Sequence, residues 1–395
     1  MSVVIGALKE TEKEKRVALT PEVVKRLVKR KYSVFIENGA GRKAFLPDRA
    51  YEAAGAKIVT REEVIRRSDV ITVINRPDEE TLTQFKNGQV MIGLLSLLVN
   101  PDSVKKLVKQ KITSLSFELL PRTLSRAQTM DALSSQAAAL GYKAVLMAAD
   151  HFSRYLPMMI TAAGTAKPAK VLVLGTGIAG LQAIATAKRL GAIVSGYDIR
   201  PTSRGEVESL GAVFLTSSVS AEGRGGYARA LTPQEQAKQQ RELADFIGQN
   251  DIIITTARVP GRKPPLLVTQ TCIADAAPGT IFVDLGASEL GGNVAGSQPD
   301  RILSNENGVQ IIGAGNAAAQ LPNAASSMYA RNVQAVLDNI IKDGALRLDL
   351  HDDVLSELTA THGGTVVSNR LRQAMHLPIR QPAEQEKVTP DQPTK

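Results

Sequence analysis

The sequence predicts an α/β protein with two Rossmann-like domains, each built on a largely parallel sheet. Short β-branched runs alternate with helical patterns from the first residues, and the same alternation begins again at Lys170. The 395 residues also exceed what one ordinary hydrophobic core holds. Strands that alternate with helices favour a parallel sheet covered on both faces.

The first unit is expected to contain six strands and four helices before one long helix. The strands are Val3–Leu8, Ser33–Glu37, Lys57–Val59, Val70–Asn75, Val90–Leu95 and Ile112–Glu118. The helices between them are Pro21–Arg30, Arg49–Ala54, Arg61–Arg67 and Asp102–Lys109. The proline-free, Ala/Leu/Met-rich stretch Asp131–Tyr155 then predicts one long helix leaving this unit.

The second unit follows a linker at Ala162–Lys170, which is rich in small residues. Its expected strands are Lys170–Leu174, Ala192–Tyr197, Val213–Leu215, Asp251–Thr256, Thr280–Leu285 and Gln310–Ile312. The amphipathic segment Ser326–Ile341 predicts a helix that packs back on the first unit. The predicted domains are therefore a discontinuous one (1–135 with 325–380), a second one with its linking helix (136–324), and a flexible tail (381–395) rich in Pro, Gln, Glu and Lys.

Composition excludes several classes of protein. The formal net charge of +9 is compatible with a basic solvated surface or with an acidic partner or membrane surface. The basic residues alternate with Glu without interleaved aromatics, so no nucleic-acid partner is expected. The single cysteine, Cys272, permits no intrachain disulfide, and the four histidines lack metal-ligand spacing, so no metal is expected. No apolar run approaches the roughly 18 residues of a spanning helix, so any membrane association is expected to be peripheral.

The strongest motif is a dinucleotide fingerprint within Val171–Asp198. Gly175, Gly177 and Gly180 form G-x-G-x-x-G between a buried strand and an amphipathic helix, and the next strand ends in an acid. In this motif the glycines allow a tight turn, a close approach of backbone to pyrophosphate, and close packing of helix on strand. Asp198 lies 23 positions after Gly175, where a carboxylate accepts hydrogen bonds from ribose hydroxyls and repels a 2′-phosphate. NAD(H) is therefore expected as the ligand in preference to NADP(H), although Arg200 stands where an arginine accommodates that phosphate.

A second polar cluster lies within Phe117–Tyr142. It contains Arg122, Arg126, Gln128, Asp131 and Ser134 at a loop and a helix start, with Asp131 and Ser134 on one helix face. Physical reasoning leaves two interpretations open. The cluster is either a capped helix with an Arg–Asp pair or a polar wall that orients a nicotinamide ring.

The chain resembles the NAD(H)-binding subunit of the proton-translocating nicotinamide nucleotide transhydrogenase family, which is related to alanine dehydrogenases. The resemblance rests on this cluster, the fingerprint, the opening IGALKETEKEKRVALTPEVVKRL, GGYAR at Gly225–Arg229 and DLGASELGGN at Asp284–Asn293. It implies that Gln128, Asp131 and Ser134 contact the nicotinamide and that Arg122 pairs with Asp131, although the spacing from Arg122 to Arg126 is one residue longer than usual. The other nucleotide-binding residues that it implies are Arg126, Gly175, Thr176, Gly177, Ile178, Gly180, Asp198, Ile199, Arg200, Gly226, Tyr227, Gln239 and Arg258.

The resemblance also implies a homodimer and membrane-spanning partner subunits, one of which carries NADP(H). This chain has one fingerprint, so direct hydride transfer between two nicotinamide rings needs a second polypeptide. The glycine-rich loop Thr216–Thr232 is expected to be a lid over the ligand, and by resemblance Gly226, Tyr227 and Gln239 belong to it.

The alternative is an enzyme similar to alanine dehydrogenase. Arg16 is present in the matching motif, but Asn75 and Ser96 stand where that family has its proton-handling lysine and histidine. No alanine dehydrogenase activity is therefore expected. A nucleotide sensor without turnover is the third class, and the polar nicotinamide wall argues against it.

Overall fold

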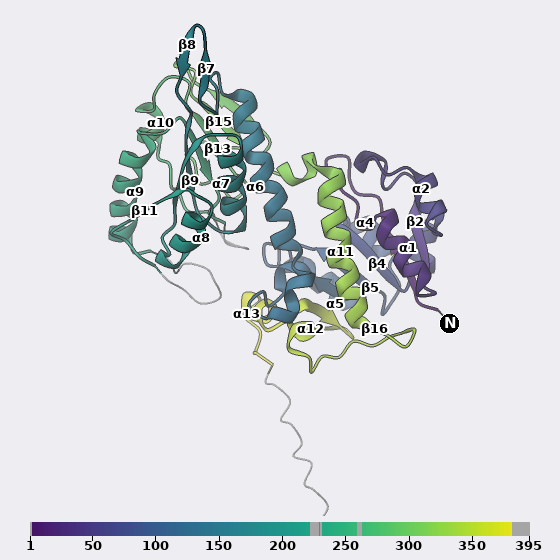
Figure 1. The fold of residues 1–395 in the computed structure, drawn as a ribbon. Coiled ribbons are helices and arrows are strands. Elements are labelled where there is room, and N and C mark those ends of the chain that lie inside the picture. Colours follow the sequence, from purple (N-terminus) through teal and green to yellow (C-terminus); the bar gives the residue numbers. More distant parts are fainter. Residues whose placement is uncertain (1, 222–228, 230, 259–262, 381–395) are drawn as a thin grey trace, which may run out of the picture.

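Two α/β units make up the chain in a computed structural model, which describes residues 2–221, 229, 231–258 and 263–380. The units lie side by side, with helices α6 and α11 between them (Figure 1). No described helix is both long enough and apolar enough to cross a bilayer.

The first unit is an eight-stranded sheet in the order β19-β18-β6-β5-β4-β1-β2-β3. Its strands from β1 to β6 are parallel, whereas β18 pairs antiparallel with β6 and β19 antiparallel with β18. The strands are β1 (Val4–Ala7), β2 (Ser33–Glu37), β3 (Lys57–Val59), β4 (Val70–Asn75), β5 (Val90–Leu94), β6 (Thr113–Ser116), β18 (Thr359–His362) and β19 (Thr365–Val366). The chain thus returns to its first sheet after completing the second.

Helices cover this sheet, and several begin at a side-chain cap. Thr60 accepts the N–H of Glu63 at the start of α3, and Asp78 accepts that of Thr81 at the start of α4. The helices are α1 (Pro21–Lys29), α2 (Asp48–Ala53), α3 (Arg61–Arg67), α4 (Glu79–Thr83), α5 (Asp102–Lys109), α12 (Asp353–Leu358) and α13 (Asn369–Ala374), with 3-10 turns η1 (Arg42–Ala44), η2 (Phe117–Leu119) and η3 (Ser125–Met130).

The second unit is a seven-stranded sheet in the order β11-β10-β9-β12-β13-β15-β14, parallel except for β14. Its strands are β9 (Lys170–Leu174), β10 (Ile193–Tyr197), β11 (Val213–Leu215), β12 (Ile252–Thr255), β13 (Ile281–Asp284), β14 (Ile302–Ser304) and β15 (Gln310–Gly313). The chain reverses direction between β9–β10–β11 and β12, so β9 lies at the switch point where α/β sheets bind ligands.

The helices of this unit are α7 (Ile178–Arg189), α8 (Arg204–Ser209), α9 (Pro233–Ile247) and α10 (Gln270–Ala274), with η4 (Pro201–Ser203) and η6 (Ala317–Gln320). A capping box between Thr232 and Glu235 begins α9 at Pro233. Two small hairpins complete the fold: β7 (Met159–Thr161) with β8 (Gly164–Ala166), and β16 (Ile341–Lys342) with β17 (Ala345–Leu346).

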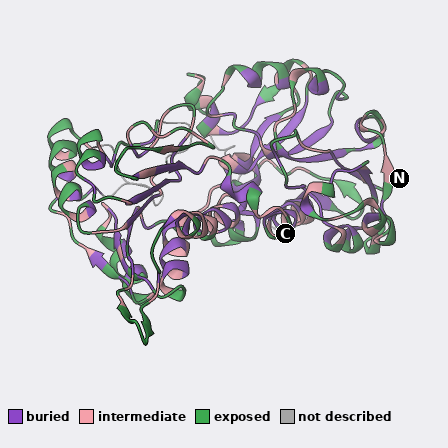
Figure 2. Cartoon of the chain, turned by 90° about the horizontal axis from the view of Figure 1, so that it is seen from above, coloured by how far each residue is buried: buried purple, intermediate pink, exposed green. Residues whose placement is uncertain are grey.

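Helix α6 (Ala132–His151) joins the units and packs against α7. An added Cβ at Gly141 would lie 2.0 Å from the carbonyl oxygen of Ala179, so the two backbones approach as closely as glycine allows. Helix α11 (Pro322–Ile340) then returns to the first unit, where Tyr329 donates to the carbonyl of Val73 at 2.7 Å. Each sheet therefore has its own buried interior, with exposed residues on the outer helices (Figure 2).

The predicted fold class is confirmed, including the return of the chain to the first unit. The expected linker Ala162–Lys170 needs correction, because its first residues complete the β7–β8 hairpin. The expected tail, 381–395, lies outside the described residues, and the domain boundaries stay a prediction.

Candidate functional site

The glycine-rich turn connects β9 to α7 at the carboxyl edge of the second sheet. Gly175 has φ +95°, a left-handed conformation that favours glycine, and its carbonyl accepts the Thr256 hydroxyl at 2.8 Å. A Cβ at Gly180 would lie 1.9 Å from the Gly175 carbonyl oxygen, so the first turn of α7 packs directly on this turn. The fold itself therefore requires two of the three fingerprint glycines.

Gly177 differs, because nothing in the chain requires it to be glycine. Its φ of −73° suits any residue, and a Cβ there would meet no atom within 4 Å. It is the N-cap of α7, with no side-chain cap and no acidic residue in the first turn. The exposed N-terminus of α7, with Ile178 as its first residue, therefore fits an anionic group such as a pyrophosphate.

Asp198 follows β10 beside this turn and is 8% exposed. One carboxylate oxygen, Oδ2, accepts the backbone N–H of Thr176 at 2.8 Å and its hydroxyl at 3.1 Å. The other, Oδ1, accepts the backbone N–H of Arg200 at 2.9 Å. Burial alone raises the pKa of Asp198, but the hydrogen bonds from Arg200 and Thr176 outweigh it and hold the pKa below its ordinary value. Thr176 thus orients the carboxylate with the groups that were expected to hold pyrophosphate.

The guanidinium of Arg200 also lies on Asp198. Its Nε donates to Oδ1 at 2.9 Å and its Nη2 to Oδ2 at 2.8 Å. Ile199, between the two, accepts the backbone N–H of Ala221 at 3.2 Å.

The second cluster forms where η3 meets α6. Arg122 donates through Nε to Asp131 at 2.8 Å and through Nη2 to the Ser134 hydroxyl at 2.7 Å. Asp131 caps α6 by accepting the Ser134 N–H at 2.9 Å, and it also accepts the Ser134 hydroxyl. Arg122, rather than Arg126, is therefore the partner of Asp131, and the longer loop does not separate them.

The other two residues of this loop lie differently. Gln128 is an exposed residue of η3. Arg126 forms ion pairs with Asp352 and Asp353 at the start of α12, which connect the loop to the C-terminal segment. Its expected contact with the nucleotide stays a prediction.

A buried polar network, which the sequence pattern did not predict, links the two units. Glu14 binds the guanidinium of Arg16 at 2.7 Å and accepts the amides of Asn75 at 3.1 Å and Asn316 at 2.8 Å. Arg16 also donates to Gln136 at 2.8 Å and to Asn316 at 3.3 Å. The only sequence signal for it is the E-x-R spacing, because the other members are distant in the chain.

Three predicted residues follow β11 or β12. Gly226 and Tyr227 lie outside the described residues. Gln239 does not belong to the loop, since the capping box starts α9 earlier; it is buried and donates to the Tyr197 hydroxyl at 3.0 Å. Arg258 is an exposed residue beyond β12, at the same edge of the sheet.

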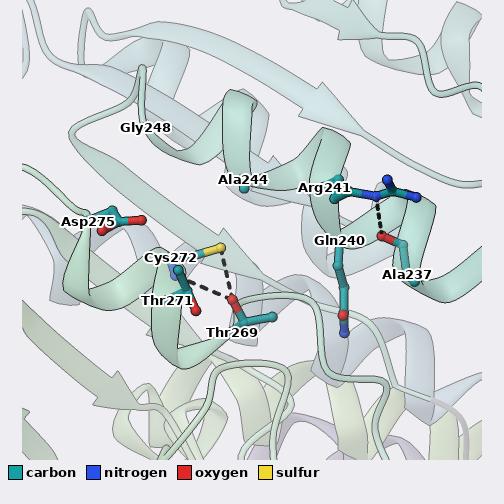
Figure 3. A pocket seen from close by; sticks show the side chains of 9 residues that line it. All are labelled: Ala237, Gln240, Arg241, Ala244, Gly248, Thr269, Thr271, Cys272 and Asp275. Carbon is teal, nitrogen blue, oxygen red and sulfur yellow. Dashed lines mark hydrogen bonds between the residues drawn. The ribbon is translucent and has the colours of Figure 1, made fainter.

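The largest cavity lies elsewhere, as a groove of about 390 Å³ between α9 and α10 (Figure 3). Its walls include Arg241, Ala244, Gly248 and Asp275, and none of its lining residues is a predicted site residue. In it the Thr269 hydroxyl donates to the sulfur of Cys272 at 3.2 Å. This groove runs along the side of the sheet and offers no convergent set of charged groups. No group of three or more His, Cys, Asp or Glu among the described residues could hold a metal ion.

The fold and this edge of the second sheet define a class: a Rossmann-type dinucleotide-binding protein with two α/β units. Family models agree in detail, since residues 6–140 match "Alanine dehydrogenase/PNT, N-terminal domain" and 144–369 match "Alanine dehydrogenase/PNT, C-terminal domain". The chain belongs to the alanine dehydrogenase/PNT family, as its resemblance predicted.

Within this family the strong similarities are to transhydrogenase subunits. The chain is 41% identical to the first segment of the divided NAD(P) transhydrogenase alpha subunit of Rickettsia prowazekii, over 93% of this chain and 97% of that protein. It is 42% identical to the corresponding protein of Rhodospirillum rubrum, over 90% and 94%. The solved transhydrogenase of Sinorhizobium meliloti superposes with a TM-score of 0.81 at 37% identity, covering 93% and 99%. An alanine dehydrogenase of Mycolicibacterium smegmatis is 26% identical, over 94% and 96%.

Proposed function

We propose that this chain is the NAD(H)-binding alpha subunit of an NAD(P) transhydrogenase, which exchanges hydride between its own nucleotide and NADP(H) on a partner subunit. The observation that carries the proposal is the position of α6. Its first turn holds Asp131 and Ser134, and Gly141 further along packs on the first turn of α7. Seven residues of helix separate Ser134 from Gly141, or about 10 Å. This spacing fits a nucleotide whose pyrophosphate lies at Gly177 and whose nicotinamide lies at the Arg122 cluster.

The residues present fit NAD(H). The open position at Gly177 and the uncapped N-terminus of α7 suit a pyrophosphate, and the buried Asp198 suits an adenosine ribose. When bound, the nicotinamide supplies the hydride chemistry. The chain's own role is to orient that ring with Gln128, Ser134 and the Arg122–Asp131 pair, because direct hydride transfer needs no general base.

The alternative, an amino-acid dehydrogenase, finds little support in the first unit. Arg16 would have to bind a substrate carboxylate, but Glu14, Gln136 and Asn316 already occupy its guanidinium. Asn75 donates to Glu14, so it lies where a proton-transferring lysine would be needed and has no titratable group.

The partners follow from the same proposal. The relatives from Rickettsia prowazekii and Rhodospirillum rubrum are named as one segment of a divided alpha subunit, which supports further subunits. Those subunits would bind NADP(H), span the membrane and hold this chain peripherally at its surface.

A second copy of the chain would make a homodimer. The β7–β8 hairpin supports this, because a two-stranded hairpin is marginally stable alone, and Tyr155, Met158 and Ile160 beside or within it are 59%, 56% and 75% exposed. Light scattering should give twice the chain mass, and Ile160→Asp should shift the mass toward one chain. A monomeric wild type at micromolar concentration contradicts the dimer.

Reconstitution tests the central proposal. The purified chain is mixed with the NADP(H)-binding domain of a transhydrogenase partner, and reduction of an NAD analogue by NADPH is followed. We expect a rate well above that of either component and a much lower rate with Asp131→Asn. Asp102→Asn, on the distant helix α5, is the matched control. No rate above the separate components refutes the assignment.

A further inference from the structure

The carboxylate expected to bind ribose is already fully used within the chain. Five donor groups reach Asp198: two from the backbone, at Thr176 and Arg200, the Thr176 hydroxyl, and two from the Arg200 guanidinium. A carboxylate offers about four lone-pair sites. A ribose diol therefore cannot bind Asp198 until a donor leaves.

Only one of these donors is able to leave without disturbing the fold. The backbone N–H groups of Thr176 and Arg200 are fixed by the turns that follow β9 and β10, and the Thr176 side chain is fully buried. The Arg200 side chain is 23% exposed, whereas the Asp198 side chain is 6% exposed. The guanidinium can therefore swing toward solvent while Asp198 stays in place.

The guanidinium also has the geometry of the group it would exclude. It donates through two neighbouring nitrogens to the two carboxylate oxygens, at 2.9 and 2.8 Å. A vicinal diol approaches a carboxylate in the same two-pronged way, with one hydroxyl for each oxygen.

We propose that Arg200 is an internal competitor of the adenosine ribose: it covers Asp198 in the nucleotide-free chain and must be displaced when NAD(H) binds. This inference rests on the proposed NAD(H) site and adds the residue that sets its selectivity. A displaced guanidinium stays beside the ribose, where it attracts a 2′-phosphate that Asp198 repels. Arg200 therefore weakens binding of NAD(H) and reduces the discrimination against NADP(H). The hydrogen bonds to Asp198 also raise the pKa of Arg200, so the competitor is always charged.

Titration of the full chain tests this inference. The chain contains no Trp, so the fluorescence of NADH and NADPH reports binding without interference from tryptophan. For Arg200→Ala we expect NADH to bind about 3- to 10-fold more tightly, which is the loss of a partly exposed ion pair. We expect NADPH to bind no more tightly or more weakly, so the ratio of the two dissociation constants rises.

Arg204→Ala is the matched control, because it removes the same charge nearby without touching Asp198. Arg204 contacts Glu208 and Thr216 instead, and its loss should leave the ratio unchanged. Damage to the fold would weaken both nucleotides together and lower the melting temperature, which separates it from the expected opposite changes.

The outcomes distinguish this inference from the proposed function. If wild-type chain binds no NADH, the proposed function fails. If wild type binds NADH but Arg200→Ala, at an unchanged melting temperature, binds it equally or more weakly, then Arg200 is not a competitor and only this inference is overturned.

Discussion

Replacing Gly177 by Ala separates the requirements of the ligand from those of the fold. The φ of −73° is compatible with alanine, and the added methyl group meets no atom within 4 Å. Gly180→Ala is the matched comparison, because its methyl group would lie 1.9 Å from the carbonyl oxygen of Gly175. The two substitutions are chemically identical and three residues apart.

The magnitudes follow from these surroundings. At Gly177 the lost chain entropy of the unfolded state favours Ala by about 0.4–1 kcal/mol, while Ala is a poorer N-cap by a similar amount. The free energy of unfolding should therefore change by less than about 1 kcal/mol. At Gly180 the backbone must shift, which costs about 1–3 kcal/mol or more.

Binding should follow the opposite order of sensitivity. A methyl group at Gly177 occupies the space where pyrophosphate approaches the backbone, so we expect NADH to bind at least about 10-fold more weakly, or about 1.4 kcal/mol. Denaturant unfolding and NADH titration measure the two effects on the same samples. Wild-type affinity in Gly177→Ala, or a loss of stability equal to that of Gly180→Ala, refutes the reasoning that the ligand alone requires this glycine.

Three further predictions concern the first unit and α6. Asp131→Asn keeps the cap of α6 but weakens the ion pair with Arg122, so transhydrogenation with the partner domain should slow at least about 10-fold while NADH affinity changes little; an equal loss of affinity would contradict a role at the nicotinamide. The wild-type chain should not oxidise NADH with pyruvate and ammonia, because Asn75 and Ser96 cannot transfer protons as lysine and histidine do, and turnover in this assay would restore the alternative. Burial raises the pKa of Glu10 from 4.5 to about 7, so its protonated form stabilises the fold below pH 4.5 and this contribution is lost as the pH rises to about 7. The loss is at most about 3 kcal/mol, and Glu10→Gln should flatten the dependence of unfolding free energy on pH; an unchanged slope in that variant would show that Glu10 is not its source.

Local pattern was enough to predict most strands and several helices. β2, β3, β4, β9 and β11 begin and end where the β-branched runs predicted. A buried strand between two helices must be apolar on both faces, and this shows directly in the sequence. The short elements α12 and α13 and the strands β18 and β19 were not predicted, because their sequences carry little periodicity and their pairing with β6 joins distant residues.

The sequence by itself determined the fold class, the fingerprint turn and the acid after β10, since each depends on neighbouring residues and on the conformations that glycine permits. Only the tertiary structure decided which arginine pairs with Asp131, and that Arg200 covers Asp198. It also decided that Glu14 and Arg16 join Asn316 across the two units. The physical reason is that charged side chains are long and several partners lie within reach of each. The choice among those partners depends on backbone positions set by contacts between residues as much as 302 apart in the sequence.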